Sequence, residues 1–301
     1  MPQTYIVDKE YHNSRFDRWF KNKIKKLPQS LVEKLIRQNK VKINKKKIKS
    51  SYRLQSGDKV EIYDISKFKE LIRSKTIKYK PAKKEINVYN NYIIEDNENF
   101  IVINKPSGIP VQSGTKSFRN IIDILKDSKI FEKNRPYIVH RLDKDTSGVL
   151  IIAKTREYAQ LFTSLFRIRK IHKTYLAIVH GNVSKSKKIL VDNLITFEKN
   201  KKLVQKAITH VKVIKNSDSY SFLELNPITG RKHQLRKQLY NIGNPIIGDE
   251  KYFLYKNTKV KYKKKILMLH AYKIKFMINN VQYNFKADYN ESFAEFLKSK
   301  I

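Results

Sequence analysis

The stretch HRLDKDTSGVLIIAK, residues 140–154, joins a polar turn directly to an apolar strand. Residues 149–153 are all apolar and rich in branched side chains, a pattern that predicts a short buried strand. Gly148 permits a sharp entry into that strand, because glycine adopts backbone conformations that other residues avoid. The side chains of the turn, Asp143 among them, are therefore expected at the rigid edge of a core.

A carboxylate at such an edge is partly removed from water, which by itself disfavours its ionised form. To stay ionised, Asp143 needs a cation, and Arg141 lies two residues away; other arginines can arrive from elsewhere in the fold. The same pattern also fits ordinary turn residues, with Asp143 and Asp145 forming a helix cap or a surface salt bridge. The spacing of histidines and carboxylates here does not predict a metal site.

The chain carries 65 basic and 27 acidic residues among 301, a formal net charge of +38. Such an excess favours a polyanionic partner, most often nucleic acid. Lysine outnumbers arginine 52 to 13, so a codon bias toward lysine is an alternative source of part of this charge. In such a chain the few arginines mark places where a planar guanidinium with several donors is needed. The 8 glycines mark places where the backbone needs a conformation that other residues avoid.

The sequence excludes several classes of site. It contains no cysteine, so no disulfide, thiolate nucleophile or cysteine-ligated zinc is possible. The start, MPQTYIVDKEYH, lacks the pattern of a signal peptide, and the longest apolar run, residues 149–153, is far shorter than a membrane span. We expect a cytoplasmic protein.

A small basic unit is predicted over residues 14–72. Apolar side chains recur at helical spacing in residues 14–27, and Pro28 ends that helix. Ser30 and Glu33 have capping-box spacing at the start of a second helix. Two strands follow at residues 41–49 and 59–63, with Gly57 in a turn before the second. The lysine-rich residues 73–90, which contain Pro81 and show no sustained period, are predicted to be a linker.

From residue 91 onward the pattern changes to a larger domain, over residues 91–301. Strand candidates outnumber helices and many connections are short, so we predict an α+β domain on a mixed, mostly antiparallel sheet flanked by helices and loops. One helix is predicted at residues 157–170, from Leu161, Leu165 and Ile168. The strands are predicted within residues 92–105 (two strands), 148–154, 172–181, 208–215, 219–227, 265–277 and 281–287.

Two further stretches carry chemically informative residues. In residues 228–253, Leu235, Leu239 and Ile242 mark one helical face, with Gly243 beyond its end. Arg231 and Arg236 lie near the start of that helix, where they could meet a carboxylate or an RNA phosphate. In the strand HKTYLAIVHG, residues 172–181, Tyr175 shares a face with Ala177 and on that ground alone fits a core aromatic residue equally well.

In the same order along the chain, four motifs resemble those of the RluA family of pseudouridine synthases. They are INKPSGIPV, HRLDKDTSGVLIIAK, KTYLAIVHG and TGRKHQLR…GNPIIGDEKY, and the resemblance spans residues 92–295. The N-terminal pattern RFDRWF…SLVEKLIRQNKVKIN…SGDKVEI resembles the S4-like RNA-binding domain, the usual partner in the RluC and RluD branch. Asn39 and Lys45 occupy two turn positions where S4-like domains prefer glycine. Detail around VQSGT, residues 111–115, favours the RluC side of the branch.

The resemblance implies that the protein isomerises specific uridines of 23S ribosomal RNA to pseudouridine, without a metal or cofactor, on a base turned out of the RNA stack. Asp143 corresponds to the essential aspartate, whereas Asp145 falls where relatives differ and receives no catalytic role. Tyr175 corresponds to the tyrosine that stacks beneath the uracil and is a candidate for removing the C5 proton. Arg236 corresponds to the arginine that pairs with the aspartate and keeps it ionised.

The resemblance also implies a substrate-binding set: Arg141, which enters the RNA stack where the uridine leaves, with His140, Arg231 and Lys105. Gln238 departs from the pattern, since relatives often have histidine there, and this leaves its local contacts undefined. We expect a monomer whose partner is 23S ribosomal RNA or its large-subunit precursor. Two other classes remain open on the sequence: a non-catalytic RNA-binding or ribosome-assembly protein, and a metal-dependent nuclease.

Overall fold

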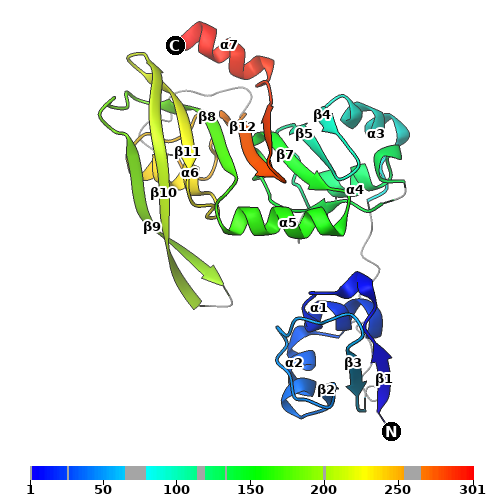
Figure 1. Ribbon diagram of the computed structural model, residues 1–301. Helices are drawn as coiled ribbons and strands as arrows, with labels where there is room; N and C mark the ends of the chain where they lie inside the picture. Colours follow the sequence, from blue (N-terminus) through cyan, green and yellow to red (C-terminus); the bar gives the residue numbers. More distant parts are fainter. Residues whose placement is uncertain are drawn as a thin grey trace. The chain divides into compact units, whose positions relative to one another are not determined.

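Two separate sheets organise the chain, one of three strands and one of ten (Figure 1). The computed structural model describes residues 2–25, 27–64, 79–113, 119–132, 134–198, 201–253 and 266–301. It divides into two units, residues 1–77 and residues 78–301, which are described separately below. The predicted α+β class is confirmed by this arrangement. Among the described residues, no helix is both long enough and apolar enough to cross a membrane.

The N-terminal unit packs two short helical segments against its small sheet. Phe16, Trp19 and Phe20 lie on the first segment, and Leu35 on the second; all are almost completely buried with the strand residue Val60. The helices are α1 (Phe16–Trp19), its continuation η2 (Phe20–Ile24), which has π-helical hydrogen bonding, and α2 (Gln29–Arg37). The strands are β1 (Gln3–Ile6), β2 (Val41–Ile43) and β3 (Lys59–Ile62), in the order β1-β3-β2.

Two details of this unit differ from the sequence expectation. It begins before residue 14, because β1 pairs with β3 and Val7 enters the core. A short edge strand joins through backbone hydrogen bonds and has little apolar pattern to reveal it. The predicted capping box is wrong: Ser30 is already inside α2, which begins after Pro28 without a side-chain cap. The backbones of Asn39 and Lys45 are left-handed, with φ of 56° and 63°, at the two positions where S4-like domains prefer glycine.

The ten-stranded sheet of the second unit is mixed and mostly antiparallel, as predicted. The strand order is β4-β5-β7-β12-β8-β11-β10-β9, with β13 paired to β12 and β6 to β7, and only β12 and β7 run parallel. The strands are β4 (Ile93–Asp96), β5 (Phe100–Lys105), β6 (Tyr137–Ile138), β7 (Ser147–Ala153), β8 (His172–His180), β9 (Ile189–Glu198), β10 (Lys201–Asn216), β11 (Tyr220–Pro227), β12 (Leu269–Ile278) and β13 (Val281–Lys286).

The strand that follows the acid turn, β7, is buried on both faces. Val149 and Ile151 point to one side and pack with Phe162 of α5 (Arg156–Arg167). Leu150 and Ile152 point to the other side and join the cluster that includes α4 (Ile121–Lys126). Because successive side chains alternate across a strand, a continuous apolar run is what a doubly covered strand requires. The apolar run at residues 149–153 therefore sits at the centre of the domain (Figure 1).

The other half of the sheet forms a second core around β8 and β11. Leu235 and Leu239 of α6 (Gln234–Asn241) pack there, and Gly243 follows the helix with φ of +82°, as predicted for its C-terminal end. The C-terminal helix α7 (Glu291–Lys300) contributes Phe293 to the same cluster. This core holds α6 against the sheet and so fixes the side chains that α6 presents.

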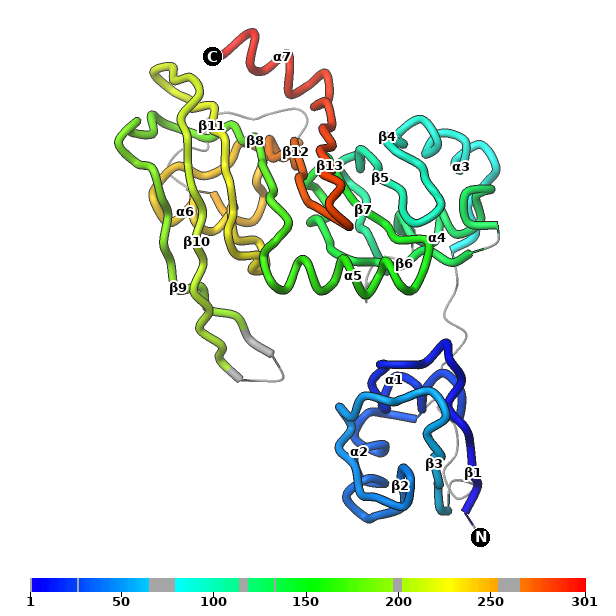
Figure 2. The backbone as a smooth tube through the Cα atoms, in the orientation of Figure 1, coloured from blue at the N-terminus to red at the C-terminus, as the bar shows by residue number. Residues whose placement is uncertain are grey.

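Four elements of the second unit differ from the prediction. Residues 83–90 of the predicted linker form helix α3 (Lys83–Asn90), which buries Tyr89 against the core near α4; residues 73–78 of that linker lie outside the described residues. The long β9–β10 hairpin was predicted only in part, as residues 208–215, and projects beyond its neighbours (Figure 2). The predicted helix at 157–170 ends at residue 167, and Ile168 is exposed.

Gly148 marks the closest approach of β7 to its parallel neighbour β12. Its φ is +111°, and a Cβ atom built on it would lie 2.2 Å from the carbonyl oxygen of Ala271. A real Cβ atom cannot occupy that place, so only glycine lets the two strands meet here. The sequence predicted only that Gly148 permits a turn. The structure shows that this glycine also allows the backbones of β7 and β12 to come into contact.

We expect Gly148→Ala to destabilise the second unit more than Gly243→Ala. Both glycines have positive φ, so alanine costs about 1–2 kcal/mol of backbone strain at either position. Gly243 faces open space, whereas at Gly148 the β12 backbone must also move, which adds about 1–3 kcal/mol. Urea unfolding of the two variants measures the difference. Equal losses in the free energy of unfolding would contradict the close approach of the strands.

Candidate active site

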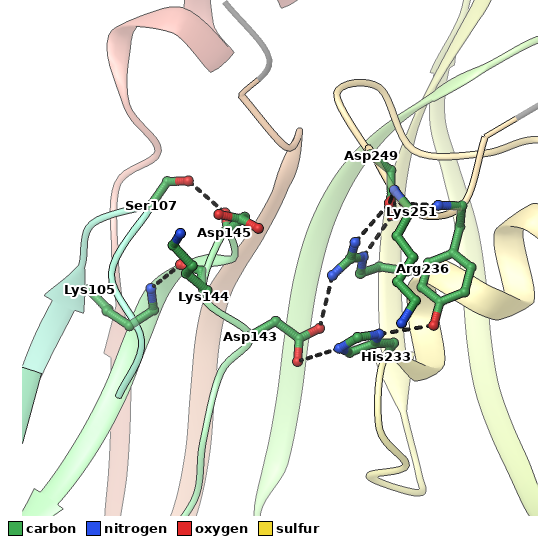
Figure 3. A network of polar contacts seen from close by, with 10 residues as sticks. Lys105, Ser107, Asp143, Lys144, Asp145, His233, Arg236, Asp249 and Lys251 are labelled. Carbon is green, nitrogen blue, oxygen red and sulfur yellow. Dashed lines mark hydrogen bonds and ion pairs between the residues drawn. The ribbon is translucent and has the colours of Figure 1, made fainter. Parts of the chain in front are cut away.

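Asp143 lies in the loop that leads into β7 and faces residues at the start of α6 (Figure 3). Its Oδ2 is 3.6 Å from Nη1 of Arg236, and its Oδ1 is 3.7 Å from Nε2 of His233. The contact with Arg236 is at an ion-pair distance, and both distances are slightly too long for hydrogen bonds. The Asp143 side chain is 25% exposed, so it remains accessible. The structure thus brings together two predicted residues, Asp143 and Arg236, that are 93 positions apart in the sequence.

The backbone of the acid turn is held by a buried lysine. Nζ of Lys105, at the end of β5, donates to the carbonyl oxygens of Pro106, Ile109 and Lys144 at 2.8, 2.8 and 3.0 Å. Burial lowers the pKa of Lys105 to about 7, and the charge of Asp145 opposes that shift. Three acceptors match the three N–H groups of an ammonium, which a neutral amine could not satisfy.

Lys105 was predicted to bind substrate, and the structure places its side chain inside the protein. Its side chain is completely buried, it does not line either cavity, and its ammonium is occupied by the three carbonyl oxygens. A motif read along the chain places Lys105 near the turn but cannot show which way its side chain points. Its contacts instead make it the support of the turn, together with Ser107, whose hydroxyl donates to the carbonyl of Asp145 at 2.7 Å.

Arg236 is anchored on its other side by a carboxylate that the sequence reasoning missed. Its Nε and Nη2 donate to the two carboxylate oxygens of Asp249, both at 2.7 Å. Asp249 has no exposed side-chain surface and also accepts from the backbone N–H groups of Lys251 and Tyr252. Burial opposes the charge on Arg236, but the Asp249 and Asp143 carboxylates raise its pKa above the ordinary value. The guanidinium therefore stays charged and presents Nη1 to Asp143.

His233, also missed, sits at the N-terminal end of α6 with a left-handed backbone, φ 54°. Its Nδ1 lies 2.9 Å from the hydroxyl of Tyr252, while Nε2 faces Asp143. Burial lowers the pKa of His233, although the Asp143 charge opposes this shift, so the ring is mainly neutral at pH 7. The motif stretches GRKHQLR and GNPIIGDEKY contained both His233 and Asp249, but residue type alone gave no reason to pair them with Arg236.

A cavity of about 750 Å³ opens beside Asp143. Tyr175 of β8, Ile228 and Leu269 give it apolar surface, and loops from both halves of the sheet close around it. Burial, with a smaller contribution from the Asp143 charge, raises the pKa of Tyr175, so its side chain is a neutral phenol at physiological pH. The cavity therefore combines a flat aromatic wall with a single carboxylate.

His140 lines the cavity as a neutral ring. Its Nε2 accepts from the backbone N–H of Ile151 at 2.9 Å, and the ring stacks on Phe166 with centroids 4.6 Å apart. Burial lowers the pKa of His140 to about 3, and the charge of Lys173 adds to that shift. His140, predicted to bind substrate, thus connects the turn to the middle of β7 and gives the cavity an uncharged wall at this point.

The two remaining predicted binding residues lie on the cavity lining and retain freedom to move. Arg141 is exposed and lines both this cavity and a second one, of about 470 Å³, on the other side of Asp143. Arg231 donates from Nε to the carbonyl oxygen of Lys206 at 3.3 Å, a weak surface contact. Both arginines are therefore placed where a large anion could reach them.

Gln238, the departure from the family pattern, is a buried structural residue. Its Oε1 accepts from the hydroxyl of Thr209 at 2.6 Å, and its Nε2 donates to Asp192 at 3.0 Å. These bonds attach α6 to β9 and β10, away from Asp143. Among the described residues, no group of three or more histidines, aspartates and glutamates is placed to hold a metal ion.

Comparisons with known proteins match both units. Residues 99–241 match the family model described as RNA pseudouridylate synthase, and residues 22–60 match the S4 domain. The sequence is 36% identical over 282 residues to "Ribosomal large subunit pseudouridine synthase C" of Buchnera aphidicola subsp. Schizaphis graminum, covering 90% of this chain and 88% of that protein. It is 34% identical to the protein of the same name from Rickettsia felis, covering 86% and 87%.

A solved structure has a similar second unit. "Human RNA Pseudouridylate Synthase Domain Containing 4" superposes with a TM-score of 0.58 and 26% sequence identity, covering 71% of this chain and 94% of that one. The similarity therefore extends over nearly the whole of the human protein's chain.

We expect Asp249→Asn to lower the free energy of unfolding by about 3–5 kcal/mol, because it leaves the buried guanidinium of Arg236 without its anionic partner. The matched control is Asp96→Asn. Asp96 pairs with Lys154 at the surface, with its side chain 39% exposed, and such pairs contribute about 1 kcal/mol or less. Urea unfolding measures both variants. A small loss in Asp249→Asn, no larger than in the control, would show that Arg236 is held by other contacts.

Proposed function

The chain belongs to the RNA pseudouridylate synthase family, and from that premise we propose that it isomerises specific uridines of large-subunit ribosomal RNA to pseudouridine. The resemblance seen in the motifs, including the S4 domain, is confirmed by the comparisons. The chain is accordingly an enzyme, an isomerase. The names of its relatives, ribosomal large subunit pseudouridine synthase C, support ribosomal RNA as the substrate.

The observation that carries the catalytic part of the proposal is the pairing of Asp143 with an anchored arginine beside a nucleotide-sized cavity. Asp143 is the only carboxylate among the described residues that line the larger cavity. In the reaction the N-glycosidic bond breaks, the uracil turns, and C5 is joined to C1′. We assign Asp143 the role of the essential acid, which either attacks the substrate or stabilises its developing positive charge. Arg236 holds that carboxylate in its charged form and in position.

The same geometry supports a reaction on a base that has left the RNA stack. C1′ and C5 of a uridine inside a helix cannot reach a carboxylate that lies at the edge of a protein core, so the nucleotide must turn outward. A volume of about 750 Å³ is ample for one nucleotide. Exposed Arg141, at the junction of the two cavities, is placed to enter the gap that the uridine leaves.

Tyr175 is proposed as the platform for the flipped uracil. Its ring lies on the cavity wall beside Asp143, and stacking of a base on an aromatic ring contributes about 1–3 kcal/mol. Because its pKa is raised, the phenol is protonated when the substrate binds. A role in removing the C5 proton then needs a proton acceptor for the hydroxyl, and we assign that role to the Asp143 carboxylate, whose charge acts on Tyr175.

The N-terminal unit is proposed to hold structured RNA through phosphate contacts, which position the enzyme without selecting the uridine. The predicted division into an S4-like domain (14–72), a linker (73–90) and a catalytic domain (91–301) stays a prediction, with α3 already part of the catalytic core. A monomeric state and a cytoplasmic location also remain predictions.

We expect Asp143→Asn to abolish pseudouridine formation and Asp145→Asn to keep most of it. The two residues occupy the same turn, but only Asp143 lines the larger cavity, while the backbone carbonyl of Asp145 supports the turn. The measurement is carbodiimide-based mapping of pseudouridine in 23S ribosomal RNA from cells that lack the gene and carry either variant. Equal loss of pseudouridine in both would refute the assignment of Asp143, and unchanged 23S RNA in cells without the gene would refute the substrate.

Arg236→Lys should lower turnover by at least about an order of magnitude, because lysine keeps the charge but cannot bind Asp249 through two parallel hydrogen bonds while facing Asp143. Arg119→Lys is the control, since Arg119 pairs with Glu85 and lines neither cavity. Turnover is measured on a ribosomal RNA fragment with each variant. Wild-type turnover in Arg236→Lys would remove this arginine from the mechanism.

A further inference from the structure

Lys173 is a cavity residue to which neither the motifs nor the mechanism assigns a role. It lies on β8 two positions before Tyr175, about 7 Å along the strand, and both residues line the cavity beside Asp143. A Cβ atom built on Gly230 would be 3.9 Å from Nζ of Lys173, so the ammonium lies close to the glycine turn that precedes Arg231. One nucleotide could therefore touch Tyr175 with its base and Lys173 with another group.

Among the residues that the structure describes, the ammonium of Lys173 has no anionic or hydrogen-bonding partner. Within the described ranges, no carboxylate lies within 4.0 Å of its Nζ and no acceptor forms a hydrogen bond with it. Lys105, the other deeply placed lysine of this region, has three carbonyl partners. Burial lowers the pKa of Lys173, which means that its charge is held at an energetic cost. A partly buried cation that faces a cavity and has no partner favours the binding of an anion in that cavity.

The surroundings of Lys173 carry the same sign of charge. Apart from Arg236, whose charge is balanced by Asp249, the described lining holds six cationic side chains and one carboxylate, that of Asp143. A neutral carbonyl of uracil could accept one hydrogen bond but could not balance this excess. A phosphodiester can do both. The cations are Arg141, Arg167, Arg169, Lys173, Arg231 and Lys232.

We propose that Lys173 binds a non-bridging phosphate oxygen of the linkage on the 5′ or the 3′ side of the flipped nucleotide. This inference rests on the proposed function. It places the base at Tyr175, the sugar at Asp143 and the phosphate at Lys173, so that a single nucleotide spans the cavity. The contact forms only when the uridine has left the stack, and it therefore contributes to the flipped state rather than to RNA binding in general.

The test uses an RNA fragment that contains a uridine modified by the wild-type enzyme, in three forms: unmodified, with an uncharged methylphosphonate on the 5′ side of that uridine, and with one on the 3′ side. Wild type, Lys173→Met and Lys170→Met are compared. Lys170 is an exposed lysine three residues earlier that does not line the cavity, so it controls for the loss of one charge. The readouts are kcat/KM and the dissociation constant from fluorescence anisotropy.

On unmodified RNA, Lys173→Met should lower kcat/KM about 10- to 100-fold, as expected for one charge-assisted hydrogen bond, while Lys170→Met changes it less than about twofold. One of the two methylphosphonates should lower the wild-type value by a similar factor and lower that of Lys173→Met no further. The position of the sensitive methylphosphonate then identifies the linkage.

Two results would overturn the proposal. One is a wild-type enzyme insensitive to both methylphosphonates; the other is a Lys173→Met enzyme that loses the same factor on all three RNAs. Lys173→Arg, which keeps the charge, must retain the sensitivity to the methylphosphonate, and it replaces Lys173→Met if that variant does not fold. A failure of the proposed function is a different outcome, because wild type then forms no pseudouridine in any RNA.

Discussion

The guanidinium of Arg236 contacts two carboxylates, and the rest of the site depends on which of its nitrogens each carboxylate binds. Two of its nitrogens bind Asp249 at 2.7 Å, in a buried bidentate pair, and the third faces Asp143 at 3.6 Å. The first carboxylate fixes the arginine and neutralises most of the cost of burying it. The second is partly exposed and remains available to a substrate. A lysine in place of this arginine could satisfy one of the two carboxylates but not both in this geometry.

The pairing only works because both sides are rigid. Asp143 is carried by a turn whose backbone carbonyls are held by Lys105 and which continues into β7, a strand covered on both faces. Arg236 is carried by α6, which Gln238 and two leucines fasten to the sheet. Gly148 lets β7 and β12 approach closely enough for the two halves of the sheet to meet. The contacts that stabilise the fold therefore also hold Asp143 and Arg236 in position. Such rigidity suits a site in which small displacements reduce activity.

Charge acts at two scales in this protein. The formal net charge of +38 attracts RNA without selecting a position on it. Within the cavity the excess of cations is local and partly desolvated, and Lys173 shows this most clearly, since it has no partner in the described part of the chain. A lysine bias in the genome can explain the exposed lysines of the surface. It cannot explain why a lysine with no partner among the described residues is kept half-buried beside Asp143, the one carboxylate of the described cavity lining.

The amino-acid sequence by itself determined the fold class, the buried strand after the acid turn, the helix that carries Arg236, and the family, because apolar periodicity and motif order are local properties. Asp143, Tyr175 and Arg236 were found by motif and do lie together at one cavity. Asp249, His233 and Lys173 could not be found in this way, and the direction of the Lys105 side chain could not be predicted, since each depends on which side chains face one another across strands and loops distant in sequence. The hairpin β9–β10 was predicted only in part and helix α3 was missed for a related reason: their apolar residues have little periodicity along the chain, and pairing and packing with the sheet decide their structure. Only the tertiary structure decides which charges are paired, because pairing depends on distances of a few ångströms that no pattern along the chain contains.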